Sequence, residues 1–331
     1  MTTLVAKRFG SMVVIVVGLA AVVFYLQHIS PLDPVHAMLG GQASASAIVQ
    51  ERHTLGLDQP VLTQFWHYLT GLVHGDLGNS YRTRRPVSTD LGSYLPATAE
   101  LALAGLVIAI ALAVLLAFGT TLRWRGAGLF RLVLFIGASA PAFLLGIGGI
   151  IVFYGYLNWL PATGRTSITN PPGGPTHLLV MDGILHWRWD VVINALEHLA
   201  MPATAIALGP AVSIGRVLRS SLVADLTSDY ARTARAKGLT EMQILRRHVL
   251  RNALGAAMSM TGLQIGLMFA GVLVVEEVFS WPGIGQYVAQ SIPVGDFPAI
   301  AGVTLVLGVG YVVINTVVDV MQAVADPRIK V

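Results

Sequence analysis

Long apolar runs constrain this chain more than any other feature of its sequence. A helix needs about 20 predominantly apolar residues to cross the hydrocarbon core of a bilayer. With 54% hydrophobic and 11% charged residues, the composition is far from that of a soluble domain. The sequence therefore predicts an all-α membrane protein, a single transmembrane domain over residues 1–331 with six transmembrane helices. We place these spans near residues 9–27, 97–121, 132–157, 198–215, 253–275 and 297–318.

The distribution of Lys and Arg predicts how these spans are oriented. An even number of crossings puts both termini on one side. If that side is the cytoplasm, 15 of the 21 basic residues lie inside, and the remaining six lie outside: Arg52, Arg82, Arg84, Arg85, Arg165 and Arg188. The positive-inside rule therefore predicts cytoplasmic N- and C-termini, an extracytoplasmic segment over 29–96 and a basic cytoplasmic loop over 219–252. Because topology accounts for the net charge of +4, no nucleic-acid partner is implied.

The most highly charged part of the chain, residues 227–254, predicts two short helices joined at Gly238. Ser228 or Asp229 can serve as the N-cap of the first helix, because both residue types accept hydrogen bonds from exposed backbone N–H groups. Gly238 suits the left-handed position that follows a helix C-terminus. These signals predict a helix that stops sharply at the glycine.

The second helix of this pair has a more specific start signal. Thr240 followed by Gln243 three residues later forms a capping box, in which each side chain satisfies a backbone N–H at the other residue. Leu239 and Ile244 occupy the positions of a hydrophobic staple across the same turn. The local sequence thus predicts helix, elbow, helix.

The first of these helices carries a stripe of small residues. Ala231, Ala234 and Gly238 share one face, which lets another backbone approach closely, and Arg232 and Arg235 lie beside them. Two interpretations are open for the basic residues. The segment is either a solvated loop held near anionic lipid or a docking element for a cytoplasmic partner.

Two runs in this segment resemble a known family. Residues 235–239 and 248–254 are similar to the cytoplasmic coupling loop of ABC-importer permeases, in the form found in dipeptide and oligopeptide importers. Residues 232–234 stand where the general motif has Glu-Ala-Ala, Gly238 stands at its glycine, and Arg251 replaces its late proline. The resemblance implies these ATPase-coupling residues: Asp229, Ala231, Arg232, Thr233, Ala234, Arg235, Ala236, Lys237, Gly238 and Leu239.

The extracytoplasmic segment resembles the N-terminal region of the B-type permease subunit of the same importers. The similarity lies in SPLDP, LGLDQP, HGDLGNS, RRPV and LPATAEL, which occur in that order between residues 30 and 101, and in the closing Asp-Pro-Arg at 326–328. Residues 60–73 have helical apolar spacing, and Trp66 and Tyr68 suit the headgroup level of a membrane. We expect an interfacial helix there.

A third segment with a family resemblance follows the fifth span. It matches a signature of Glu, a hydrophobic residue and Phe, followed by Pro-Gly-hydrophobic-Gly ending at Gly285. Carboxylates at the end of a span are costly if they face lipid, so we expect them to face water or the bundle interior. The segment either lines the pathway as an extracytoplasmic gate or only positions the chain at the interface. The candidate residues are Glu276, Glu277, Phe279, Pro282 and Gly283.

Several chemistries lack any sequence signal. There is no GxxxxGK[ST] phosphate loop, no HExxH or comparable metal spacing, no GxSxG elbow and no cysteine. We therefore expect a non-catalytic transport subunit with no metal site and no cofactor of its own, with ATP and Mg bound by partner ATPases.

Together these resemblances identify the chain as similar to B-type transmembrane permease subunits of dipeptide and oligopeptide ABC importers, the DppB/OppB type. The resemblance implies a MetI-like permease fold and a multi-pass location in the bacterial plasma (inner) membrane. It implies as partners a homologous C-type permease, two cytoplasmic ABC ATPase subunits or domains, an extracytoplasmic substrate-binding protein and a peptide substrate. Nickel, glutathione or haem are alternative cargoes. A secondary transporter is a further alternative, although its mid-membrane ionisable residues are missing from these spans.

Overall fold

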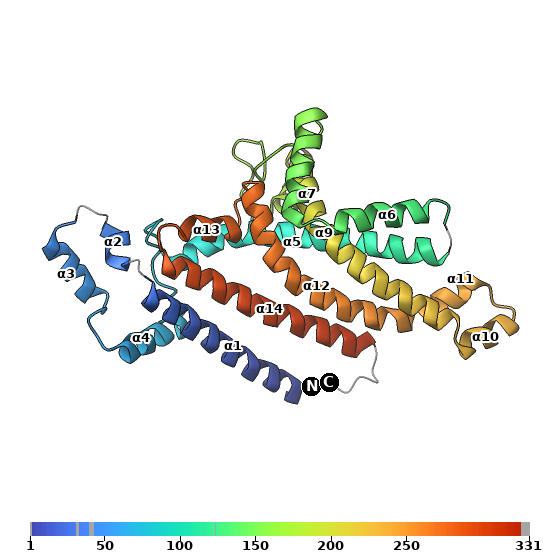
Figure 1. Ribbon diagram of the computed structural model, residues 1–331, viewed down its shortest axis with the longest axis horizontal. Coiled ribbons are helices and arrows are strands. Elements are labelled where there is room, and N and C mark those ends of the chain that lie inside the picture. The colour runs from blue at the N-terminus through green and yellow to red at the C-terminus, as the bar shows by residue number, and fades with distance from the viewer. Residues whose placement is uncertain (1, 31–32, 40–42, 123, 326–331) are drawn as a thin grey trace. The chain divides into compact units, whose positions relative to one another are not determined.

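The computed structural model describes residues 2–30, 33–39, 43–122 and 124–325, so the Asp-Pro-Arg motif at 326–328 lies outside the described residues. The described part is helical and contains no strand, only an isolated bridge between Asn79 and Pro86 (Figure 1). The α-helices are α1 (Thr2–Ile29), α2 (Pro34–Leu39), α3 (Ala45–Thr54), α4 (Val61–Val73), α5 (Val87–Thr121), α6 (Ala127–Ala138), α7 (Ala142–Gly149), α8 (Leu179–Leu185), α9 (Trp189–Leu226), α10 (Asp229–Ala236), α11 (Glu241–Ile244), α12 (Leu250–Val278), α13 (Ile284–Ser291) and α14 (Phe297–Ala325). Two π-helical segments, η1 (Ile150–Tyr156) and η2 (Leu245–Val249), continue α7 and α11.

All the apolar runs except 132–157 fall on the longest helices of the described part. Five helices within the described residues are long and apolar enough to cross a membrane, and there are six if α6 and the helix formed by α7 and η1 count as one broken span. The run at 198–215 is only the centre of α9, which continues for a further turn or more at both ends. Its two prolines, Pro202 and Pro210, do not interrupt the helix, because neighbouring helices can compensate for the backbone hydrogen bonds that proline removes.

The run at 132–157 departs most from a simple span. Its two halves meet at an angle of 106°. The break falls at residues 139–141, where Ser139 ends α6 and Pro141 is the N-cap of α7. Proline has no backbone N–H and disfavours helical geometry at the residue before it, which explains why the helix stops here.

Contacts divide the chain into two compact units. The first comprises residues 1–97 and 282–312. Its interior contains two buried carboxylates with hydroxyl donors: Ser80 donates to Asp296 at 2.5 Å, and Tyr287 donates to Asp90 at 3.0 Å. Burial raises the pKa of Tyr287, and the neighbouring Asp90 raises it further. The helix expected over residues 60–73 is confirmed as α4 of this unit, with Trp66 exposed, and its interfacial position stays a prediction.

The second unit comprises residues 98–281 and 313–331. Its core forms where α9 packs along α12 and against α5. At Gly215 of α9 a Cβ atom would lie 3.1 Å from the carbonyl oxygen of Ala113, so only glycine allows α5 and α9 to pack at this distance. Within this unit α10 and α11 lie at one end of the α9–α12 pair (Figure 1). The unit therefore joins long apolar helices to the charged elbow.

Candidate functional site

The elbow around Gly238 has the predicted geometry. Lys237 caps α10, and Gly238 follows it with a φ of +84° in the left-handed region. The N–H of Gly238 donates to the carbonyl of Arg235 at 2.9 Å, and the N–H of Leu239 donates to that of Ala234 at 3.2 Å. These two bonds form a Schellman motif, which satisfies carbonyl groups that the end of a helix would leave free.

The start of α11 is also confirmed. The hydroxyl of Thr240 accepts the N–H of Gln243 at 3.3 Å, and the side-chain oxygen of Gln243 accepts the N–H of Thr240 at 2.9 Å. At the start of α10, Ser228 is the N-cap by backbone geometry, but its side chain makes no capping bond. Its hydroxyl donates instead to the carbonyl of Asp225 at 2.5 Å, at the end of α9. The N-cap is therefore Ser228, one of the two residues predicted, but its hydroxyl joins α10 to α9 and makes no capping bond.

The small-residue stripe on α10 packs against this chain's own helices. Ala231 is fully buried and Ala234 is 7% exposed. They lie in one cluster with Leu218 and Leu222 of α9 and with residues of α11, η2 and α12, among them Ile244. The small side chains thus allow the close approach that the sequence predicts, but the backbone that approaches them belongs to the same chain.

The remaining surface of the elbow is exposed and basic. Its exposed residues include Arg232, Thr233, Arg235 and Lys237, together with Arg246, Arg247 and His248 of η2. Arg235 makes a two-point ion pair across the elbow with Glu241, at 2.5 and 3.0 Å. Because both side chains are solvent-exposed, this pair adds little to stability but favours one arrangement of α10 and α11.

A cavity lies among the long helices of the same unit. It has a volume of about 500 Å³ and is lined by residues of α6, α7, α9 and α12, close to the 106° bend. Most of its lining is apolar or small. The polar lining residues are Ser139, Ser213, Arg216 and Gln264.

The candidate gate residues are found in different environments. Glu276 is fully buried and accepts a hydrogen bond from Thr98 at 2.6 Å, whereas Glu277 is exposed. Phe279 is 2% exposed, and its carbonyl accepts the N–H of Gly164 at 2.8 Å. Of the two carboxylates that we expected to avoid lipid, Glu276 lies in the interior and Glu277 lies on the surface.

Pro282 and Gly283 begin the C-terminal part of the first unit, where Gly283 is the N-cap of α13. Gly283 is buried and Pro282 is half-buried. Their backbone role is to start this short helix after the chain leaves α12.

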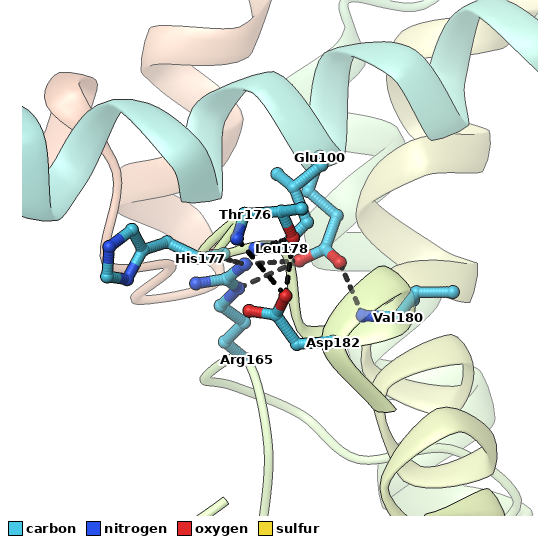
Figure 2. Close-up of polar contacts among 7 residues, drawn as sticks. All are labelled: Glu100, Arg165, Thr176, His177, Leu178, Val180 and Asp182. Atoms are coloured by element: carbon cyan, nitrogen blue, oxygen red, sulfur yellow. Dashed lines mark hydrogen bonds and ion pairs between the residues drawn. The ribbon is translucent and has the colours of Figure 1, made fainter. Parts of the chain in front are cut away.

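A buried ion pair was not expected from the sequence. Arg165 donates from Nε and Nη2 to Oε2 of Glu100 at 2.9 and 2.6 Å, and Oε1 of Glu100 accepts the N–H of Val180 at 2.8 Å (Figure 2). Arg165 also donates to the carbonyl of His177 at 2.8 Å. The pair therefore connects α5 with the 158–178 segment and with α8. The signal available in the sequence was a glutamate near the start of an apolar run, which requires a partner.

These features define a class of protein: a polytopic helical membrane protein whose long helices carry a rigid, basic, exposed elbow. Residues 105–331 match the family described as "Binding-protein-dependent transport system inner membrane component", and residues 1–102 match the N-terminal component of the same systems. The chain belongs to this family. It is a permease subunit of the inner membrane, which confirms the resemblance, the permease fold class and the location.

The curated relatives match over almost the full length. The chain is 38% identical to the probable D,D-dipeptide transport system permease protein DdpB of Escherichia coli K12, covering 99% of this chain and 97% of the relative. It is 35% identical to the dipeptide transport system permease protein DppB of Alkalihalophilus pseudofirmus, covering 98% of each. It is 34% identical to the glutathione transport system permease protein GsiC of Salmonella typhimurium, covering 100% of this chain and 99% of the relative.

Proposed function

We propose that this chain is the B-type permease subunit of an ATP-driven importer of dipeptides and oligopeptides, and that it forms half of the translocation pathway. Two of the relatives described above are named as dipeptide permeases. Family membership supports a substrate-binding protein and ATPase partners in general terms. We propose in particular a homologous C-type permease, two cytoplasmic ABC ATPase subunits or domains, and an extracytoplasmic binding protein.

The observation that carries the proposal is the attachment of the elbow. Its outer surface is exposed and basic, while Ala231 and Ala234 on its inner face are buried against α9, α11 and η2. A partner that moved this surface would therefore move α9 and α12 with it, because both helices share the buried cluster. Because the capped turn at Gly238 resists bending, a displacement of the elbow would be transmitted to α9 and α12. We assign ATPase coupling to Asp229 and to residues 231–239 on this ground.

The cavity among α6, α7, α9 and α12 supports a pathway role for the same helices. Movement of α9 and α12 would reshape this cavity, since both contribute to its lining. Glu276 and Phe279 lie in α12 and at its C-cap, so the same movement would carry them. We therefore propose that the segment around Glu276 responds to the ATPases as an extracytoplasmic gate.

Glutathione is a second candidate cargo. The specific observation in its favour is the 34% identity with a glutathione permease subunit over full length. Glutathione is a modified tripeptide, so it would require the same recognition of a short peptide backbone.

Topology and coupling can be tested together, because the chain has no cysteine and single cysteines can be introduced without background. Lys237→Cys on the elbow and Ser46→Cys on α3 are both at exposed positions. In right-side-out membrane vesicles, an impermeant maleimide should label Ser46→Cys and leave Lys237→Cys unlabelled. Lys237→Cys should also crosslink to a co-expressed ATPase, and the crosslinking yield should differ between samples with and without nucleotide. External labelling of Lys237→Cys without any ATPase crosslink would refute the proposal.

A further inference from the structure

Gln264 is an unusual polar residue in an apolar helix. It lies near the middle of α12, and no charged residue occurs between Arg251 and Glu276. Two other polar side chains of this helix, Ser259 and Thr261, return their hydroxyls to carbonyl groups one turn earlier, at 3.2 and 2.8 Å. Polar groups at this depth of a membrane are expensive and tend to be functional.

The amide of Gln264 is not satisfied in the same way. Its hydrogen-bonding contact within the described residues is from Nε2 to the sulfur of Met260, at 3.7 Å. A thioether is a weak acceptor, and it offers nothing to the side-chain oxygen. The residue is nevertheless 9% exposed, so bulk water reaches it poorly. The amide therefore keeps hydrogen-bonding capacity for a group that enters the site.

The cavity provides room for that group. Gln264 is part of the lining of the cavity of about 500 Å³ among α6, α7, α9 and α12. Leu267 and Arg216 also line it and are exposed, so the cavity opens on the surface of the unit. Arg216 is the one charged lining residue within this part of the structure. The site therefore disfavours a free cation and tolerates a carboxylate.

The chemistry of a primary amide matches that of a peptide bond. Oε1 of Gln264 can accept the N–H of a peptide bond, and Nε2 can donate to a carbonyl on another part of the ligand, because the C=O and N–H of one trans peptide bond point in opposite directions. These bonds do not depend on the side chains of the ligand. We propose that Gln264 is a specificity residue that hydrogen-bonds a backbone amide of the transported peptide. This inference rests on the proposed function in peptide import.

The test replaces the N–H of the ligand. Alanyl-lactate is the ester analogue of alanyl-alanine, in which oxygen replaces the amide N–H, so it cannot donate to Oε1 of Gln264. Uptake of both compounds, in L,L and D,D forms, would be measured with the complete transporter in a strain lacking other dipeptide uptake systems. Comparing variants by the ratio of amide to ester uptake cancels the preference of the binding protein.

Gln264→Met keeps an unbranched side chain of similar size but has no amide. We expect it to reduce the amide-to-ester uptake ratio about two- to tenfold, the range for one neutral hydrogen bond. Leu267→Met, on the same helix and in the same cavity, is the matched control and should keep the wild-type ratio. Gln264→Leu provides the same comparison if Gln264→Met accumulates poorly.

Each result has a distinct meaning. A Gln264→Met or Gln264→Leu transporter that is present at normal levels and keeps the wild-type amide-to-ester ratio would overturn the role of Gln264 and leave the proposed function standing. Wild-type transporter that takes up neither alanyl-alanine nor alanyl-lactate in either form would overturn the dipeptide part of the proposed function, and the inference with it.

Discussion

Replacing Gly238 tests whether the geometry of the elbow matters for transport. The residue has a φ of +84°, and a Cβ atom added there would meet no atom within 4 Å. Gly238→Ala therefore introduces conformational strain without steric overlap. Left-handed backbone geometry costs an L-residue about 1–2 kcal/mol. We expect Gly238→Val to be worse, because β-branched residues are genuine outliers at positive φ.

A loss of 1–2 kcal/mol corresponds to about a 5–30-fold change in the equilibrium between the ordered and the opened elbow. The amides of Leu239 and Gln243 report on this equilibrium, because both donate hydrogen bonds that form only when the elbow is closed. Hydrogen exchange of a peptide covering residues 238–244 should accelerate by this factor in Gly238→Ala. Peptide uptake should fall in the order wild type, Gly238→Ala, Gly238→Val, at equal protein levels in the membrane.

Two variants separate backbone strain from other effects. Asn tolerates left-handed geometry better than other non-glycine residues, so Gly238→Asn should keep most of the uptake. Gly255→Ala changes a helical glycine of α12 that has no positive φ and no atom within 4 Å of its added Cβ, so it should leave uptake intact. A well-expressed Gly238→Val protein that imports peptide normally would refute a role for left-handed geometry at this residue, and so would a Gly238→Asn protein as impaired as Gly238→Val.

Three further predictions concern stability, measured by thermal unfolding in detergent. Glu100→Gln should cost about 3–5 kcal/mol, because it leaves the largely buried Arg165 without its carboxylate. The double variant Glu100→Gln with Arg165→Met should recover most of that loss, and a double variant no more stable than the single one would contradict this account. Gly215→Ala should destabilise by about 1–3 kcal/mol, because the new Cβ would lie 3.1 Å from a backbone oxygen of α5, whereas Gly209→Ala on the same helix meets no atom within 4 Å and should not; equal effects would show that α5 and α9 do not pack closely. Burial raises the pKa of Tyr287 above its ordinary value of about 10, so the folded state keeps the phenol proton to higher pH than the unfolded state; stability should fall as pH rises above about 10, and Tyr287→Phe should reduce that fall, whereas an unchanged pH slope would argue against a buried phenol.

The elbow could be predicted from sequence because its signals are local. The glycine at 238 and the Thr240–Gln243 capping box act within a few residues, and both have the expected geometry. The sequence did not predict which backbone packs against the small residues of α10. Ala231 is as compatible with a partner's backbone as with this chain's own α9, and only the folded arrangement decides between them.

The sequence could not predict long-range residue pairs either, because they also depend on the folded arrangement. Glu100 and Arg165 are 65 residues apart, and no local pattern links a glutamate in a helix to an arginine in an irregular segment. The bend in the 132–157 run was more accessible, since Pro141 stands in its middle and proline ends helices. Apolar content alone predicted the run as one span and gave no information on its direction.

We propose that this chain is one of two permease subunits of an ATP-driven peptide importer and that the ATPases move it through its elbow. The most direct measurement is purification of the tagged chain from detergent-solubilised native membranes, with identification of the co-purifying subunits and assay of ATP hydrolysis with and without short peptides. We predict a second permease, ATPase subunits and hydrolysis that rises when peptide and binding protein are added. A chain that purifies alone and moves solute in response to a proton or sodium gradient would contradict the account.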